Sequence, residues 1–394
     1  MEARSRPSCD SLRRWVGAVL AVTACGRIGF GSPADELADA GSADGSQADG
    51  WPAPDATPPA ADGAPLDASP LPNAVFVTSA WYAPASLGGL AGADGICQDL
   101  AQAAGLPGTF VAWLSTSTVD ARDRLAGARG WARRDGKPVA DTLADLTAGR
   151  ILHPPRVDER GAEVGTGAEY TVTATMAEGT LDGSGTCADF TAANGTVGYG
   201  MPYGGTAAWT AHALTTCGTP TRIYCFGIDR VAPLARVPAA GRRAFVTGAA
   251  FAPTGGVAAA DALCAGEAAT AGLAGSFRAL VATGSASALS RFAIVPTRPW
   301  VRPDGIPLTP DYVTLASAPN VTATGDYIGG VNVWSGAADA GSTGSAATTC
   351  DDWMAGGAAS SGTFGSAFVA SPAFFGSTTG GCDATWRRLY CLEE

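Results

Sequence analysis

Basic side chains and histidines are scarce in this chain of 394 residues. Lys137 is the only lysine, His153 and His212 are the two histidines, and the formal net charge is −11. Nucleic-acid binding needs a clustered basic face, whereas arginines occur here in isolated pairs such as Arg133-Arg134 and Arg387-Arg388. The composition therefore argues against nucleic acid as a partner.

Motifs of catalysis are also missing. The sequence contains no Gly-x-Ser-x-Gly elbow, no phosphate-binding loop and no His-Glu-x-x-His. His153 and His212 both lie in the first copy of the repeat described below, so a Ser-His-Asp triad cannot operate in the second copy. The pair Asp351-Asp352 could act as an acid–base couple, but neighbouring residues of a strand point to opposite faces. We expect a structural or solvated role for this pair and a non-catalytic role for His212.

The apolar run Trp15–Ala24 is too short to span a bilayer and has the form of the central region of a signal peptide. It ends in Val22-Thr23-Ala24-Cys25, which resembles a bacterial lipobox. The resemblance implies that residues 1–24 are removed and that Cys25 carries a lipid. The expected location is the cell envelope of a bacterium, at the outer membrane or cell surface. An ordinary secretory signal is the alternative.

Residues 25–73 differ in composition from the rest. From Gly31 onward the stretch is rich in Ala, Asp, Gly, Pro and Ser, with eight acidic residues and no basic one. Such a segment has almost nothing to bury, so we expect a disordered, solvated tether.

One stretch then occurs twice without a gap. Five residues recur 167 positions later: Asp94, Cys97, Gly105, Gly108 and Phe110, as Asp261, Cys264, Gly272, Gly275 and Phe277. A repeat of this period indicates a duplicated domain. We predict a first module at 74–227, a linker at 228–243 and a second module at 244–394. Each is expected to be α+β with a mixed sheet.

Each copy reads as a helix that leads into a strand. An apolar helical stripe predicts that Cys97 faces inward. Gly105 and Gly272 stand where a helix end needs a positive φ, and alternation over 110–114 predicts a strand. The only other helix expected is at 141–147.

Four cysteines recur in each copy at nearly equal spacing. They are Cys97, Cys187, Cys217 and Cys225 in the first copy, and Cys264, Cys350, Cys382 and Cys391 in the second. The spacing lacks the Cys-x-x-Cys and histidine pattern of a zinc site, so a disulfide framework in an oxidising compartment is expected. Four cysteines allow three pairings, and spacing does not choose among them.

Several of these motifs together resemble endostatin, a domain with a C-type-lectin-like fold that ends collagens XV and XVIII. The matching segments are Asp94 to Phe110 and its repeat, Val333-Trp334-Ser335-Gly336, Thr349-Cys350-Asp351-Asp352-Trp353 and Leu389-Tyr390-Cys391. Bacterial exported proteins of unassigned function carry similar domains. The resemblance implies a nested pairing, with Cys97–Cys225 outside Cys187–Cys217 and Cys264–Cys391 outside Cys350–Cys382.

The metal sites of related domains have no counterpart here. Ala318-Pro319-Asn320 lacks the carboxylate of the Glu-Pro-Asn signature of calcium-dependent lectins, and neither 74–78 nor 244–247 contains a zinc-binding histidine. Calcium needs several oxygen ligands, usually including carboxylates. We therefore expect no metal and no cofactor. The heparin affinity of animal endostatin is not expected either, because the sequence has no clustered basic face.

The leading hypothesis is a monomeric, lipid-anchored, non-enzymatic protein whose two modules bind a glycan or a protein. The expected ligand-binding residues are Tyr199, Tyr203 and Trp209, because they lie in a loop that differs between the copies. The alternatives are an envelope hydrolase that acts on polysaccharide or peptidoglycan through carboxylates, and a purely structural envelope protein.

Overall fold

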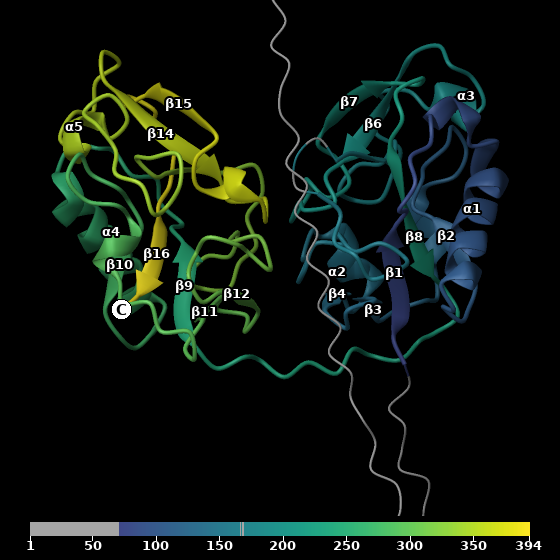
Figure 1. Ribbon diagram of the computed structural model, residues 1–394, viewed down its shortest axis with the longest axis horizontal. Helices are drawn as coiled ribbons and strands as arrows, with labels where there is room; N and C mark the ends of the chain where they lie inside the picture. Colours follow the sequence, from purple (N-terminus) through teal and green to yellow (C-terminus); the bar gives the residue numbers. More distant parts are fainter. Residues whose placement is uncertain (1–70, 166, 168) are drawn as a thin grey trace, which may run out of the picture. The chain divides into compact units, whose positions relative to one another are not determined.

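The computed structural model describes residues 71–394 except 166 and 168 (Figure 1). The predicted signal segment, Cys25 and almost all of the predicted tether lie outside the described residues. Within them the fold is α+β, as predicted, with sheet predominating over five short or medium helices and with four disulfides. No helix of the described part is long and apolar enough to cross a membrane.

The first repeat (74–227) builds one mixed, eight-stranded sheet. Its order is β4-β3-β1-β8-β5-β6-β7, with β2 also paired to β8. The strands are β1 (Asn73–Val77), β2 (Phe110–Ala112), β3 (Trp131–Arg133), β4 (Pro138–Ala140), β5 (Thr171–Val172), β6 (Thr196–Gly200), β7 (Ala213–Thr216) and β8 (Arg222–Gly227). The helices are α1 (Gly89–Ala103), α2 (Leu143–Thr147) and α3 (Cys187–Phe190), with 3₁₀ turns η1 (Pro84–Ser86) and η2 (Ala121–Leu125).

The second repeat (244–394) uses the same strand sequence but splits it into two sheets, ordered β10-β16-β9-β11-β12 and β13-β14-β15. The strands are β9 (Arg242–Val246), β10 (Phe277–Ala279), β11 (Trp300–Val301), β12 (Pro307–Thr309), β13 (Asn332–Trp334), β14 (Ser361–Ser366), β15 (Thr378–Gly381) and β16 (Tyr390–Glu393). The helices are α4 (Gly256–Thr270) and α5 (Cys350–Trp353), with η3 (Leu289–Arg291) and η4 (Pro372–Phe374). The two sheets are separate because β13 contacts the chain before β16 only through an isolated bridge, Val333 with Arg388.

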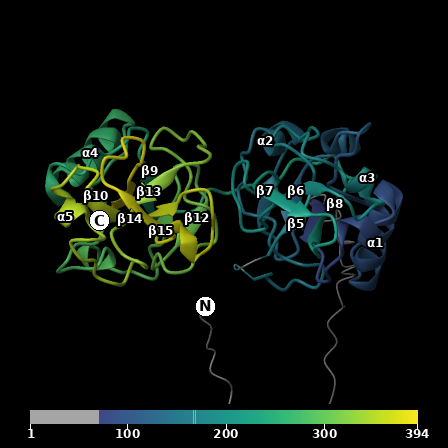
Figure 2. The ribbon, with the colours of Figure 1, turned by 90° about the horizontal axis from the view of Figure 1, so that it is seen from above.

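Small residues let each long helix pack closely on its sheet. Figure 1 shows α1 against β2 and β8, and Figure 2 shows α4 beside β10. The buried face consists of residues spaced four apart: Ala93, Cys97 and Ala101 in α1, and Ala260, Cys264 and Ala268 in α4. Gly105 and Gly272 follow the helix ends with φ of 69° each, which confirms the predicted C-terminal glycines.

The repeated aspartate ties each helix to the next strand. Asp94 accepts a hydrogen bond from Ala112 N at 2.9 Å and pairs with Arg124 of η2 at 2.5 Å. In the second repeat, Asp261 does the same with Ala279 N and Arg291 of η3, at 2.9 and 2.5 Å. The sequence analysis did not include this arginine in the repeated motif, although Arg124 and Arg291 also stand 167 positions apart.

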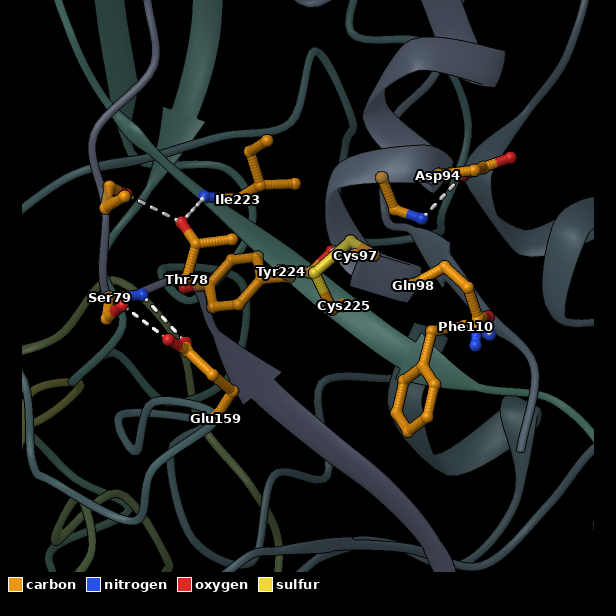
Figure 3. The surroundings of a disulfide bond; sticks show 12 residues. Thr78, Ser79, Asp94, Cys97, Gln98, Phe110, Glu159, Ile223, Tyr224 and Cys225 are labelled. Carbon is orange, nitrogen blue, oxygen red and sulfur yellow. Dashed lines mark hydrogen bonds between the residues drawn. A yellow bond between two sulfur atoms is a disulfide. The ribbon is translucent and has the colours of Figure 1, made fainter. Parts of the chain in front are cut away.

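The disulfides join Cys97 to Cys225, Cys187 to Cys217, Cys264 to Cys391 and Cys350 to Cys382. This is the nested pairing that the resemblance implies. Each outer bond links the long helix to the last strand of its repeat, as Figure 3 shows for α1 and β8. Each inner bond closes the loop that follows the left-handed turn described next.

The segments at the second cysteine of each repeat form a left-handed turn. In α3 and α5, four consecutive residues other than glycine have φ between 50° and 68°. Asp352, expected on a strand, lies in this turn and accepts hydrogen bonds from Thr349 Oγ1 at 3.2 Å and Gly284 N at 2.7 Å. Its role is therefore structural, but through a turn rather than a strand.

The two repeats also contact each other within one compact unit. Gly205 N donates to Phe368 O at 2.7 Å, and Ala370 N donates to Tyr203 O at 2.8 Å. Met201, Tyr203 and Ala208 of the first repeat belong to a hydrophobic core made mainly by the second. The segments around Tyr203 and Phe368 are structurally equivalent. Each begins three residues after a glycine, Gly200 or Gly365, that has no room for a side chain. A Cβ atom would clash with Trp209 O at Gly200 and with Phe374 O at Gly365.

Candidate functional site

The loop closed by the inner disulfide of the first repeat holds the three predicted ligand-binding residues. Tyr199, Tyr203 and Trp209 are 8%, 6% and 0% exposed. The ring of Trp209 packs against Trp113, with centroids 5.2 Å apart, and against Tyr224 at 5.4 Å. Trp209, which the sequence analysis expects to bind a ligand, is therefore a core residue in the structure.

Tyr203 is likewise held by its surroundings. Its hydroxyl donates to Gly167 O at 2.9 Å, and its carbonyl oxygen accepts from Ala370 N in the second repeat. Burial raises the pKa of the Tyr203 phenol to about 12. This ring therefore belongs to the contact between the repeats rather than to an open loop.

Tyr199 leads from the core to an aromatic surface. Its ring lies 4.4 Å from that of Tyr170 and 5.8 Å from that of His212, centroid to centroid. The strands explain this proximity, because Tyr170 directly precedes β5 and Val172 of β5 pairs with Tyr199 of β6. Tyr170 and His212 are both partly exposed.

An arginine connects this surface to an exposed tryptophan. Arg222, which pairs with Thr171 at the start of β8, forms an ion pair with Glu169 at 2.6 Å. Its guanidinium lies over the ring of Trp81, 4.6 Å from the centroid, and Trp81 is 42% exposed. We call Trp81, Glu169, Tyr170, Tyr199, His212 and Arg222 the aromatic cluster of the first repeat.

A surface groove begins at the histidine end of this cluster. It has a volume of about 330 Å³ and is lined by His212, Met176, Leu214, Asp182, Ser184 and neighbouring small residues. Met176 and Leu214 are 44% and 55% exposed. Burial lowers the pKa of His212, so its imidazole is neutral at pH 7.

The second repeat has the same strands and strand-end arginine as this site, but not its exposed aromatic and apolar side chains. Arg388 Nη1 donates to Thr247 O at 3.1 Å, just as Arg222 Nη1 donates to Thr78 O at 2.6 Å. Strand register and turn positions place small or polar residues where the aromatic cluster and groove have larger ones. Ala250, Asn332, Ser377, Ala338 and Thr379 replace Trp81, Tyr170, His212, Met176 and Leu214.

Glu159 is the most buried carboxylate near the cluster, at 2% exposed. It accepts hydrogen bonds from Ser79 N, at 2.9 Å, and from Ser79 Oγ (Figure 3). Ser79 O in turn accepts from Arg222 Nη1 at 2.8 Å. Glu159 thus fixes the turn after β1 that carries Trp81. Among residues 71–394, no group of three or more His, Cys, Asp or Glu is placed to hold a metal ion.

The sequence analysis named Tyr199 as a ligand-binding residue but did not name Trp81, Glu169, Tyr170 or Arg222. The sequence could have indicated Trp81, because the copies are alike around this position but the second has Ala250 where the first has Trp81. No protein-family model and no curated protein matches the chain.

Proposed function

We propose that this chain is a non-enzymatic binding protein and that the aromatic cluster of the first repeat is its ligand site. The observation that carries the proposal is Trp81, a ring that is 42% exposed and that stacks on the guanidinium of Arg222, which is itself ion-paired with Glu169. Exposed aromatic residues with polar neighbours offer large contact areas at low entropic cost. The ligand is a glycan or a protein segment.

The repeated frame supports a binding role. The second repeat preserves the aspartate, the disulfides and the strand-end arginine, but has no aromatic residue at the positions equivalent to Trp81, Tyr170 and His212. A stable scaffold with locally different surface groups is typical of binding proteins. The site needs neither calcium nor zinc in this proposal.

The remaining expectations form part of the same proposal. The two repeats are endostatin-like modules of C-type-lectin-like fold, joined at 228–243 and acting as a monomer. Cys25 carries the lipid, and residues 25–73 hold the modules away from the envelope. Four disulfides support an exported protein, because such bonds persist in oxidising compartments.

Ligand binding is tested by screening the purified chain against arrayed glycans and envelope proteins, followed by substitution. We expect Trp81→Ala to weaken binding of any ligand found by roughly tenfold, the usual effect of losing an aromatic anchor. Trp386→Ala is the matched control, because Trp386 is 53% exposed and also lies beside an arginine, in the second repeat. Equal effects of both changes would refute this site. Shortening of a bound polysaccharide would support the hydrolase instead.

The anchor is tested separately. With Cys25→Ser we expect no incorporation of labelled fatty acid and no cleavage by the lipoprotein signal peptidase, because the thiol is the acylated group. A wild-type chain that is cut elsewhere and remains unlabelled would show that the segment is an ordinary secretory signal.

A further inference from the structure

The second repeat contains a cavity of about 500 Å³ that is separate from the aromatic cluster. One wall is the outer face of α4, at Ala262, Leu263, Gly266, Glu267 and Thr270. The other walls are the turn after β9, at Gly248 and Ala249, and the tight turn at 322–326. The volume lies in the range typical of small-molecule sites.

A comparison with the first repeat explains why the cavity is there. The tight turns at 158–162 and 322–326 have the same hydrogen bonds, so Ala323 stands where the first repeat has Glu159. In the first repeat the side chain of Glu159 fills this place and accepts from Ser79 N (Figure 3). Ala323 leaves the space open.

A carboxylate is nevertheless retained, and it comes from the helix. Glu267 of α4 accepts from Gly248 N at 2.7 Å and Ala249 N at 2.8 Å, at the turn equivalent to Ser79. By the gapless repeat, the first copy has Leu100 at this helix position. The carboxylate thus lies on the tight turn in the first repeat and on the helix in the second. The apolar partner is Leu100 in the first repeat but only Ala323 in the second, so the second repeat has less side-chain volume here.

The cavity has a negative end and apolar walls. Two backbone N–H groups hold the Glu267 carboxylate in place, and Asp326 accepts from Thr324 Oγ1 at 2.6 Å. No salt bridge within the described residues involves Glu267 or Asp326. Ala262, Leu263 and Ala323 supply apolar surface between them. The Glu267 carboxylate, held by two backbone N–H groups, and the exposed Asp326 carboxylate lie beside apolar walls, an arrangement that complements a cation carrying hydrocarbon.

We propose that this cavity binds a small organic ammonium, with the charged nitrogen at Glu267 and Asp326 and the hydrocarbon against Leu263 and Ala323. An inorganic cation would leave the apolar walls unused. An anion would face two carboxylates, and a neutral alcohol would gain no ionic attraction.

The test uses matched probes on the full chain: pentylamine, 1-pentanol and pentanoate, titrated by heteronuclear NMR at low salt. We expect pentylamine to shift the amide signals of Leu263, Glu267 and Ala323 and to bind roughly tenfold more tightly than 1-pentanol, with pentanoate causing no saturable shift. Equal binding of the amine and the alcohol would overturn the proposal.

Variants then locate the site. Glu267→Gln and Asp326→Asn should each weaken pentylamine binding by roughly fivefold, since each removes one ionic attraction. Ala262→Leu, on the exposed side of α4, should block the cavity without disturbing the core. Asp123→Asn is the matched control, because that carboxylate is 69% exposed and lies in the first repeat. Unchanged affinity in Glu267→Gln, with the fold retained, would also overturn the assignment.

Discussion

At the scale of single residues, His153 shows how a rare side chain can be used for packing. It is 4% exposed, and its Nδ1 lies 2.8 Å from Ser317 Oγ and 3.3 Å from Ala316 O. Ser317 Oγ donates its own proton to Leu152 O at 2.6 Å. Nδ1 must therefore carry the imidazole proton, which assigns the neutral Nδ1–H tautomer.

Stability should depend on pH through this residue. Burial, aided by the nearby positive charges of Arg302, Arg133 and Lys137, lowers the pKa of His153 from 6.5 to about 3. Above pH 6.5 both folded and unfolded chains carry the neutral ring. As the pH falls below 6.5 only the unfolded chain takes up the proton, so the free energy of unfolding decreases. The loss attributable to His153 should reach about 2 kcal/mol at pH 5.

Urea denaturation at pH 7 and pH 5 measures this loss. His153→Asn, which keeps a donor but does not titrate, should show a smaller decrease than the wild type. His212→Asn is the comparison, because His212 is less buried. If wild type and His153→Asn lose stability equally, the burial of a neutral His153 is not the cause.

The same scale shows where sequence reasoning reaches its limit. The buried Cys97, the two C-terminal glycines and the disulfide framework could be predicted, because each depends on spacing along the chain. The burial of Trp209 and Tyr203 could not, because it depends on Trp113 and Ala370, which lie far away in the sequence. Arg222 was missed for the same reason, since it is the bridge between their neighbours Tyr82 and Thr221 that brings Arg222 to Trp81.

At the scale of elements, the left-handed turns are the least expected part of the fold. Residues with a side chain avoid this region, because Cβ approaches the following carbonyl oxygen. The turn is held by Thr186, whose hydroxyl accepts from Asp189 N at 3.0 Å, and by the disulfide at Cys187. Asp189 in turn accepts from Ser117 N at 2.8 Å. Helix propensity scales carry no signal for such a turn, so 187–190 was not predicted as helical.

A glycine substitution tests the turn. Ala188 is exposed and has φ of 50°, so Ala188→Gly should remove a steric cost and raise the free energy of unfolding by about 0.5–1 kcal/mol. Ala265→Gly is the matched control in the right-handed helix α4, and it should lower stability by about 1 kcal/mol. Thermal and urea unfolding measure both. A loss of stability in Ala188→Gly would contradict the left-handed conformation.

At the scale of the whole molecule, the two repeats share one set of stabilising contacts but differ in their surface sites. Both repeats keep the helix-to-strand aspartate, the arginine from a 3₁₀ turn and two nested disulfides. The first adds the aromatic cluster, and the second opens a cavity beside Glu267. The net charge of −11 fits the cationic ligand proposed for that cavity. The two repeats thus have the same stabilising contacts and different candidate binding surfaces.

The disulfides should contribute unequally to that stability. The outer bonds span 128 and 127 residues, and the inner bonds 30 and 32. Because a longer closed loop restricts the unfolded chain more, we expect about 5 kcal/mol from each outer bond and about 3.5 kcal/mol from each inner bond. Replacing both Cys97 and Cys225 by alanine should therefore destabilise the first repeat more than replacing both Cys187 and Cys217. Urea denaturation of the full chain measures the two losses, and non-reducing peptide mapping verifies that the remaining pairs are unchanged. A larger loss from the inner pair would show that the left-handed turn, rather than loop length, decides the contribution of these bonds.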